Sequence, residues 1–274
     1  MKPLTMLIAL ILFIPILFSC KSGINPDSSG LWDKYSGNPV LSKSNEISGD
    51  RVDWDYFCAY SSDGTNWTKY ENNPVLEPSP GGWDYVGLET VSILLDPEAP
   101  KTERYKMWYD AVDTVVNRQE TDYRSNIGYA KSNNCKNWVK HADNPVLSTG
   151  NWGEWDASVI QDPFVMKIDK TYYMWHSWFP EWIEGTDLTG VYSIGLAYSS
   201  DGINWIKSEN NPVLRKGSNG RWDDVLVGFP SIILEGDVLK MYYTGLNESI
   251  IPEFPQPYNW DIGYATLYLA DLNP

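Results

Sequence analysis

Cysteine is scarce in this chain, with three among 274 residues. A small domain stapled by disulfides needs more cysteines than this, so the fold must depend on the packing of its core. Cys20 follows an apolar stretch near the N-terminus, Cys58 falls in a predicted strand, and Cys135 falls in a turn of a different repeat. We therefore expect no disulfide between Cys58 and Cys135.

Apolar residues at helical spacing are also missing after the first 20 residues. The apolar runs are short, alternating or β-branched, and they are bounded by Gly, Pro, Asn and Asp. Such runs are typical of β-strands. The sequence therefore predicts an all-β domain with almost no helix.

Positive charge is in deficit, because 21 Lys and Arg face 36 Asp and Glu, a formal net charge of −15. This charge repels nucleic acid and anionic lipid head groups and favours a neutral, soluble ligand. The chain has two histidines and no HxxxH, CxxC, EF-hand, P-loop or GxSxG motif. We expect no metal, no cofactor and no nucleic-acid partner.

The N-terminus has the composition of a secretory signal. Lys2 precedes an apolar run over residues 4–18, which Pro15 interrupts and which is shorter than the roughly 20 residues of a membrane span. Cys20 directly after Ser19 resembles a bacterial lipobox, in which the cysteine is acylated. We predict a lipoprotein signal peptide over residues 1–20, a polar tether over 21–30 and a location in the bacterial cell envelope, with the lipid as the only membrane contact. The alternative is an ordinary signal peptide.

The most informative feature is a repeated segment. IGLAYSSDGINWIKSENNPVL at residues 194–214 returns as CAYSSDGTNWTKYENNPVL at 58–76 and as IGYAKSNNCKNWVKHADNPVL at 127–147. NPVL also occurs at residues 38–41 and IGYA at 262–265. Recurrence of this kind indicates one supersecondary unit laid down several times.

Each unit starts at Trp-Asp and contains four strand-like runs before NPVL; in the first full unit these are residues 90–95, 105–109, 127–131 and 138–140. Four antiparallel strands repeated around a centre form a β-propeller blade. The third unit lacks a fourth run, and we expect residues 32–41 to supply it, which removes a free sheet edge. Residues 39–74 have room for only half a blade. We predict three full blades and one short blade in a single domain over residues 31–274.

The turn SSDGxNW pairs Asp63 with Gly64 and Asp201 with Gly202, which is hairpin chemistry because Gly accepts positive φ. It resembles the Asp-box of sialidases, and we interpret it as a structural device whose Trp packs between blades. Asn134 and Cys135 replace the Asp-Gly pair in the middle unit, so we expect strain or a different turn there.

These units, together with Gln161-Asp162-Pro163-Phe164, resemble the five-bladed β-propeller glycoside hydrolases of the arabinanase, levansucrase and invertase superfamily. The resemblance spans residues 31–267. It implies five blades, three axial acids that serve as general base, general acid and orienting carboxylate, and no cofactor. We expect a monomer that hydrolyses or processes glycosidic bonds of oligo- or polysaccharides. Alternatives are a glycan-binding propeller that has lost part of its acid set, and a scaffold for protein partners.

Blade geometry selects the candidate site. First strands start at the mouth of the central funnel, and second strands and the loops after them return to it. We predict catalytic roles for Asp162, as base or orienting carboxylate, and for Glu89 or Glu181 as acid. Two such carboxyls lie roughly 5 Å apart in retaining glycosidases and about 6.5–9.5 Å apart in inverting ones. The structural alternatives are a strand-capping Asp162 beside Pro163 and an exposed turn acid at Glu89.

The predicted carbohydrate-binding residues come from the second strands and the following loops. They are Asp110, His176, Trp178, Trp182, Glu184 and Trp260. The two tryptophans at 178 and 182 fall outside the regular repeat positions, which favours stacking on sugar rings. For His176, orientation of a carboxylate and packing against neighbouring tryptophans are both open.

Overall fold

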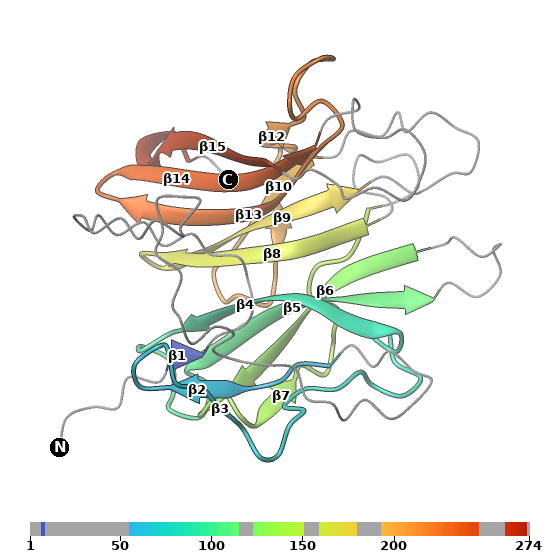
Figure 1. Cartoon of the computed structure of the whole chain (residues 1–274), viewed down its shortest axis with the longest axis vertical. Coiled ribbons are helices and arrows are strands. Elements are labelled where there is room, and N and C mark those ends of the chain that lie inside the picture. The colour runs from blue at the N-terminus through green and yellow to red at the C-terminus, as the bar shows by residue number, and fades with distance from the viewer. Residues whose placement is uncertain are drawn as a thin grey trace, which may run out of the picture.

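The computed structural model describes residues 7–8, 55–114, 123–150, 159–179, 193–246 and 261–272. This part of the chain is all-β, as predicted, apart from a single 3₁₀ turn at Leu269–Asp271. Figure 1 shows antiparallel sheets that follow one another along the long axis of the molecule. In these ranges no helix is long and apolar enough to cross a membrane.

Two sheets contain four strands in chain order. The first comprises β4 (Gly87–Leu95), β5 (Tyr105–Thr114), β6 (Tyr123–Ser132) and β7 (Trp138–Lys140). The second comprises β8 (Val159–Ile168), β9 (Thr171–Phe179), β10 (Ser193–Ser199) and β11 (Ile206–Lys207). One parallel bridge from Ser125 to Val159 joins them. This order matches the predicted repeat unit.

The third sheet has three strands in the described ranges: β13 (Leu226–Glu235), β14 (Val238–Leu246) and β15 (Asp261–Tyr268). The first strands lie together, since β8 contacts both β4 and β13. Three apolar clusters fill the spaces between and beside these sheets. The described sheets do not form a closed ring.

The predicted short unit contains β2 (Ala59–Ser61) and β3 (Thr68–Lys69). Leu7–Ile8, within the predicted signal peptide, form β1, which pairs antiparallel with β2. The closing strand at residues 32–41, the tether at 21–30 and Cys20 lie outside the described residues. The blade number, the closure and the signal peptide therefore stay predictions.

In the three NPVL segments that the structure describes, the asparagine clamps the backbone at the third strand. Its Oδ1 accepts a backbone N–H at 2.7–2.8 Å. Its Nδ2 donates to the carbonyl of the same residue at 2.9–3.0 Å. The pairs are Asn73 with Cys58, Asn144 with Tyr129, and Asn211 with Leu196. The same three carbonyls also accept a backbone N–H from the residue after the fourth strand, at 2.8–2.9 Å. The amide thus supplies the partner of the N–H and a second donor to the carbonyl, which explains why the motif recurs. In the last copy the leucine begins β12 (Leu214–Arg215), which pairs with β10.

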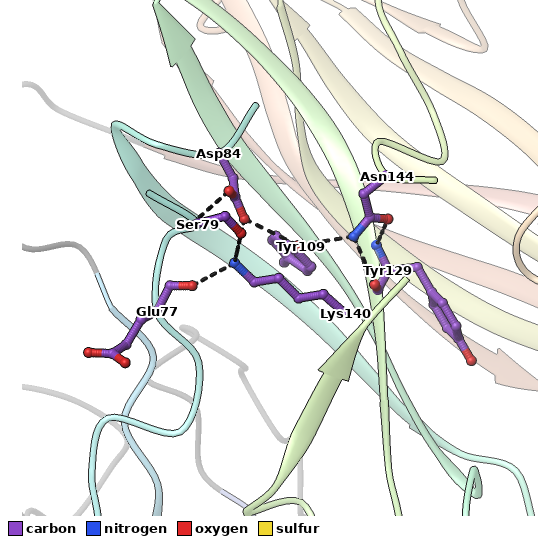
Figure 2. Close-up of polar contacts among 7 residues, drawn as sticks. All are labelled: Glu77, Ser79, Asp84, Tyr109, Tyr129, Lys140 and Asn144. Atoms are coloured by element: carbon purple, nitrogen blue, oxygen red, sulfur yellow. Dashed lines mark hydrogen bonds and ion pairs between the residues drawn. The ribbon is translucent and has the colours of Figure 1, made fainter. Parts of the chain in front are cut away.

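In the first full unit, the Asp of the Trp-Asp pair ties the strands together (Figure 2). Asp84 is fully buried, accepts the Ser79 N–H at 2.9 Å and pairs with Lys140 of β7 at 2.5 Å. The Tyr109 hydroxyl of β5 lies 3.5 Å from Asp84 and accepts a hydrogen bond from Asn144 at 3.2 Å. One network therefore joins the unit start, two strands and the NPVL segment.

The repeated aromatic residues pack in the same way in two units. Trp83 lies 5.8 Å from Tyr109, and Trp222 lies 5.7 Å from Tyr243, measured between ring centroids. A Cβ on Gly128, the Gly of IGYA, would approach Trp83 and Tyr109 to 2.6 and 2.7 Å, so that position requires glycine. These repeated residues therefore have a packing role in the fold.

The predicted hairpin turns form. Asp63 and Asp201 accept backbone N–H groups two and three residues on. Asn134 keeps this pattern, and Cys135 adopts φ of 58°, so the predicted strain is present. Trp205 after the last turn packs at 6.1 Å against Trp108 of the preceding unit, as expected.

Replacing Asn144 by Ala should lower the free energy of unfolding by about 2 kcal/mol, because the Tyr129 N–H loses its partner, whereas the Tyr129 carbonyl keeps the His141 N–H. Urea unfolding measures the change. Asn137→Ala, at an exposed turn position, is the control and should change stability by less than about 0.5 kcal/mol. Equal effects of the two substitutions would contradict the clamp.

Candidate active site

A β-bulge interrupts the first strand of each sheet. The register shifts between Leu88 and Val91 in β4, between Gln161 and Phe164 in β8, and between Gly228 and Ser231 in β13. Two residues therefore face one at each bulge, namely 89–90, 162–163 and 229–230. Bulges change the direction of side chains, and these three occur on the strands that lie side by side.

Three carboxyl groups meet at the first two bulges, and we call Glu89, Asp110 and Asp162 the acid cluster. Gln161 of β8 donates a hydrogen bond to the Glu89 carboxylate of β4. The negative charge of Glu89 acts on the pKa of both Asp110 and Asp162. The structure thus brings together two of the three residues predicted as catalytic and one predicted to bind substrate.

Thr90 holds the cluster in place. Its N–H donates to Asp110 Oδ1 at 2.7 Å, and its hydroxyl donates to the same oxygen. The hydroxyl also bonds Asp162, and the Thr90 carbonyl accepts the Tyr56 hydroxyl at 2.7 Å. Thr90 therefore contacts two of the three carboxyl groups, and each contact lowers the pKa of the carboxyl that it reaches.

The pKa of Asp162 is raised to about 7. Burial is the main cause, since the residue is 8% exposed, and the charge of Glu89 adds to it, whereas hydrogen bonds from Ser177 and Thr90 oppose it. Asp162 Oδ2 is buried and has no hydrogen-bond partner among the described residues. Such a carboxyl keeps a proton near neutral pH and can donate it to a leaving group.

Asp110 is fully buried, and burial together with the charges of Asp162 and Glu89 raises its pKa well above the usual range. Its contacts with Thr90 favour a positioning role over contact with substrate. His176 is also fully buried, which lowers its pKa to about 4 and keeps the ring neutral. Trp178 on β9 is buried as well. Their predicted roles in carbohydrate binding stay predictions.

Four of the predicted site residues lie outside the described residues, namely Glu181, Trp182, Glu184 and Trp260. In the described ranges no group of three or more His, Cys, Asp or Glu could hold a metal ion. Sequence reasoning missed Thr90, Gln161 and Ser177, although Gln161 directly precedes the Asp-Pro pair. No local signal marks Ser177, because its role depends on strands from two sheets.

No protein-family model matches the chain. A 1,2-β-oligomannan phosphorylase from Thermoanaerobacter sp. (strain X514) is 26% identical over 185 residues, which cover 64% of this chain and 58% of that protein. The chain thus spans less than two thirds of the length of this curated relative.

Two solved structures show the fold. One comes from work on the family 130 mannoside phosphorylases, which include glycoside hydrolases that target β-1,2 mannosidic linkages in Candida mannan. It has 22% identity and a TM-score of 0.54, and covers 78% of this chain and 58% of that chain. The other is a family 32 β-fructofuranosidase from Bombyx mori with 16% identity and a TM-score of 0.53. The match covers 76% of this chain and 38% of that chain. Propeller-type glycoside hydrolases share the fold of this chain, which confirms the predicted resemblance.

The raised pKa of Asp162 makes stability depend on pH in a defined direction. The pKa of this carboxyl is about 4 in the unfolded state and about 7 in the folded state, so between these pH values only the folded state keeps the proton. The contribution of Asp162 to the free energy of unfolding therefore falls as pH rises from 4 to 7. Asp162→Asn should match wild type near pH 4 and should be more stable at pH 8 by on the order of 2–4 kcal/mol, measured by urea unfolding.

Asp201→Asn is the control of opposite sign. Although desolvation opposes it, hydrogen bonds from Asn204, Ile203 and Ser199 lower the pKa of Asp201 to about 2. The Asp201 carboxylate adds to the free energy of unfolding above its unfolded pKa, and this contribution is lost as pH falls towards 2. Asp201→Asn should therefore be less stable than wild type at pH 8. A difference between wild type and Asp162→Asn that does not change with pH would contradict the assigned pKa.

Proposed function

We propose, from the fold shared with propeller-type glycoside hydrolases and from the acid cluster, that this protein hydrolyses glycosidic bonds of β-mannosidic glycans. Asp162 is the general acid and Glu89 is the ionised second carboxylate. The observation that carries the proposal is a buried Asp162 whose pKa is about 7 beside the negative charge of Glu89. This reverses the roles predicted from sequence, because burial favours the protonated form of Asp162 over that of Glu89.

In the proposed reaction Asp162 donates its proton to the glycosidic oxygen while the bond from that oxygen to the anomeric carbon breaks. Glu89 either takes a proton from a water that attacks the anomeric carbon or bonds that carbon itself. Water supplies the proton that restores Asp162. Two carboxyls of different pKa are the groups this chemistry requires, and different environments set their roles.

Water is the proposed acceptor, although the curated relative is a phosphorylase. A phosphate acceptor needs Arg or Lys side chains beside the reacting atoms. No Lys or Arg of the described ranges is among the charges that act on the pKa of Asp110 or Asp162. The proposal also retains the sequence-based expectations of a monomer without a cofactor, anchored at Cys20 in the bacterial cell envelope.

The finer fold proposal is closure by the N-terminal strand. Ile127 and Ile194 are fully buried beneath NPVL segments, whereas Ile262 of β15, in the third IG[YL]A copy, is 64% exposed. Residues 38–41 carry the unassigned NPVL. We propose that this segment lies against β15, with Leu41 opposite Ile262 and the amide of Asn38 on the backbone of Tyr264.

A Leu41→Cys and Ile262→Cys double variant tests this closure. Antiparallel partners lie close enough for a disulfide, so oxidation should give an intramolecular cross-link that is absent from each single variant. Mass spectrometry of a non-reduced digest measures it. Leu41→Cys with Leu234→Cys, which is exposed on another strand, is the control and should not cross-link. A cross-link in the control alone would overturn the proposed closure.

Asp162→Asn and Glu89→Gln should each lower kcat on β-1,2-mannotetraose by about 10²–10⁴-fold, because each removes one partner of acid–base catalysis. Glu71→Gln, at an exposed loop acid, should retain the wild-type rate. Product analysis with and without inorganic phosphate identifies the acceptor: free mannose supports hydrolysis, and mannose 1-phosphate formed only with phosphate contradicts it.

The same assay extends to arabinans, fructans and xylans. Cleavage of one of these in place of the mannan would correct the proposed substrate. Full rate in both acid variants would show that the acid cluster is not the catalytic site. A protein that binds glycan and cleaves none would instead be the glycan-binding propeller.

A further inference from the structure

The third sheet places an aromatic side chain where the second places an acid. Phe229 and Asp162 are both the first residue of a bulge, both precede a proline, and both have φ of 53°. The Phe229 side chain is 43% exposed, whereas the strand residues before it are buried. An acid on β8 and an exposed ring on β13 therefore occupy matching positions on neighbouring strands.

The backbone of Phe229 is unfavourable for its side chain. A φ near +50° is accessible to glycine, but a bulky residue is rarely found there because its Cβ crowds the carbonyl. Backbone strain of this kind concentrates at functional sites, where the surrounding structure holds it in place.

A single hydroxyl links Phe229 to the acid cluster. The Phe229 N–H donates to Ser177 Oγ on β9 at 2.8 Å. The Ser177 hydroxyl also hydrogen-bonds the Asp162 carboxyl. One hydroxyl can accept the first bond while it donates the second. The backbone of Phe229 is therefore tied, through one hydroxyl, to the carboxyl that is proposed to protonate the leaving group.

We propose that Phe229 is the platform on which the sugar ring next to the scissile bond stacks. A phenyl ring has no hydrogen-bonding group, so it suits the apolar C–H face of a pyranose. A neutral sugar also suits a site surrounded by carboxyl groups, which repel anionic ligands. Phe229 thus selects and orients the substrate and takes no part in proton transfer. This inference rests on the proposed function of Asp162.

The test uses the full chain with Asp162→Asn in every variant, so that binding is measured without turnover. Calorimetric titration with β-1,2-mannotetraose gives Kd, and a thermal melt gives Tm. Phe229→Gly should weaken binding about tenfold, the loss expected for one aromatic contact. Its Tm should be equal to or above that of the parent, because glycine relieves the unfavourable φ.

Phe229→Tyr and Phe229→Leu separate the aromatic face from mere bulk. Tyr should keep Kd within about twofold, and Leu should weaken binding nearly as much as Gly does. Equal binding by the parent and Phe229→Leu would overturn the inference, as would a Phe229→Gly variant that loses Tm and keeps its Kd. The inference would also be overturned if the loss of affinity in the three variants paralleled their loss of Tm, whether or not the ring is aromatic.

The outcome is separable from that of the proposed function. Wild type that cleaves the tetraose, together with an unchanged Kd in Phe229→Gly, leaves the function standing and removes Phe229 from the site. If wild type binds the tetraose without cleaving it and Phe229→Gly has a weakened Kd, the proposed hydrolase activity is wrong and the role of Phe229 in binding stands. Absence of any binding to the parent protein overturns both.

Discussion

The β-bulge in each first strand is the constraint on which the candidate site depends. A regular strand would send alternate side chains to opposite faces of the sheet. Two residues opposite one break that alternation near the start of β4, β8 and β13. The break turns Glu89, Asp162 and Phe229 out of the regular pattern on three strands that lie side by side. Two acids and one ring follow from a single backbone device.

The chemistry of the acid cluster follows from burial more than from the identity of the acids. An exposed aspartate is ionised at neutral pH, whereas desolvation together with the charge of Glu89 raises the pKa of Asp162 to about 7. Thr90 and Ser177 limit the effect by hydrogen bonding, and they also fix where the carboxyl lies. Positions that look like ordinary small polar residues of a strand thus set both the acidity and the geometry of the site.

The repeat could be predicted because each of its sequence motifs has a structural role within its own unit. NPVL recurs because its Asn clamps the strand beside it. Trp-Asp recurs because Asp84 and Asp223 are buried and each accepts a hydrogen bond from a Tyr hydroxyl. The Gly of IGYA recurs because the aromatic pair leaves no room for a Cβ. These tasks involve neighbours within one unit, so their traces appear at fixed spacing. Glu89 and Asp162 were found in the same way, from their place at strand starts and from the resemblance to propeller glycosidases.

By itself, the sequence determined the all-β class, the order of strands within the full units and the turn chemistry, since all of these are properties of single strands and adjacent residues. Tertiary structure alone decided which acids have a raised pKa, because burial depends on what other sheets place around a carboxyl. It alone revealed Thr90 and Ser177, whose hydroxyls act between sheets, and the strained φ of Phe229, which depends on a pairing register that no local pattern records.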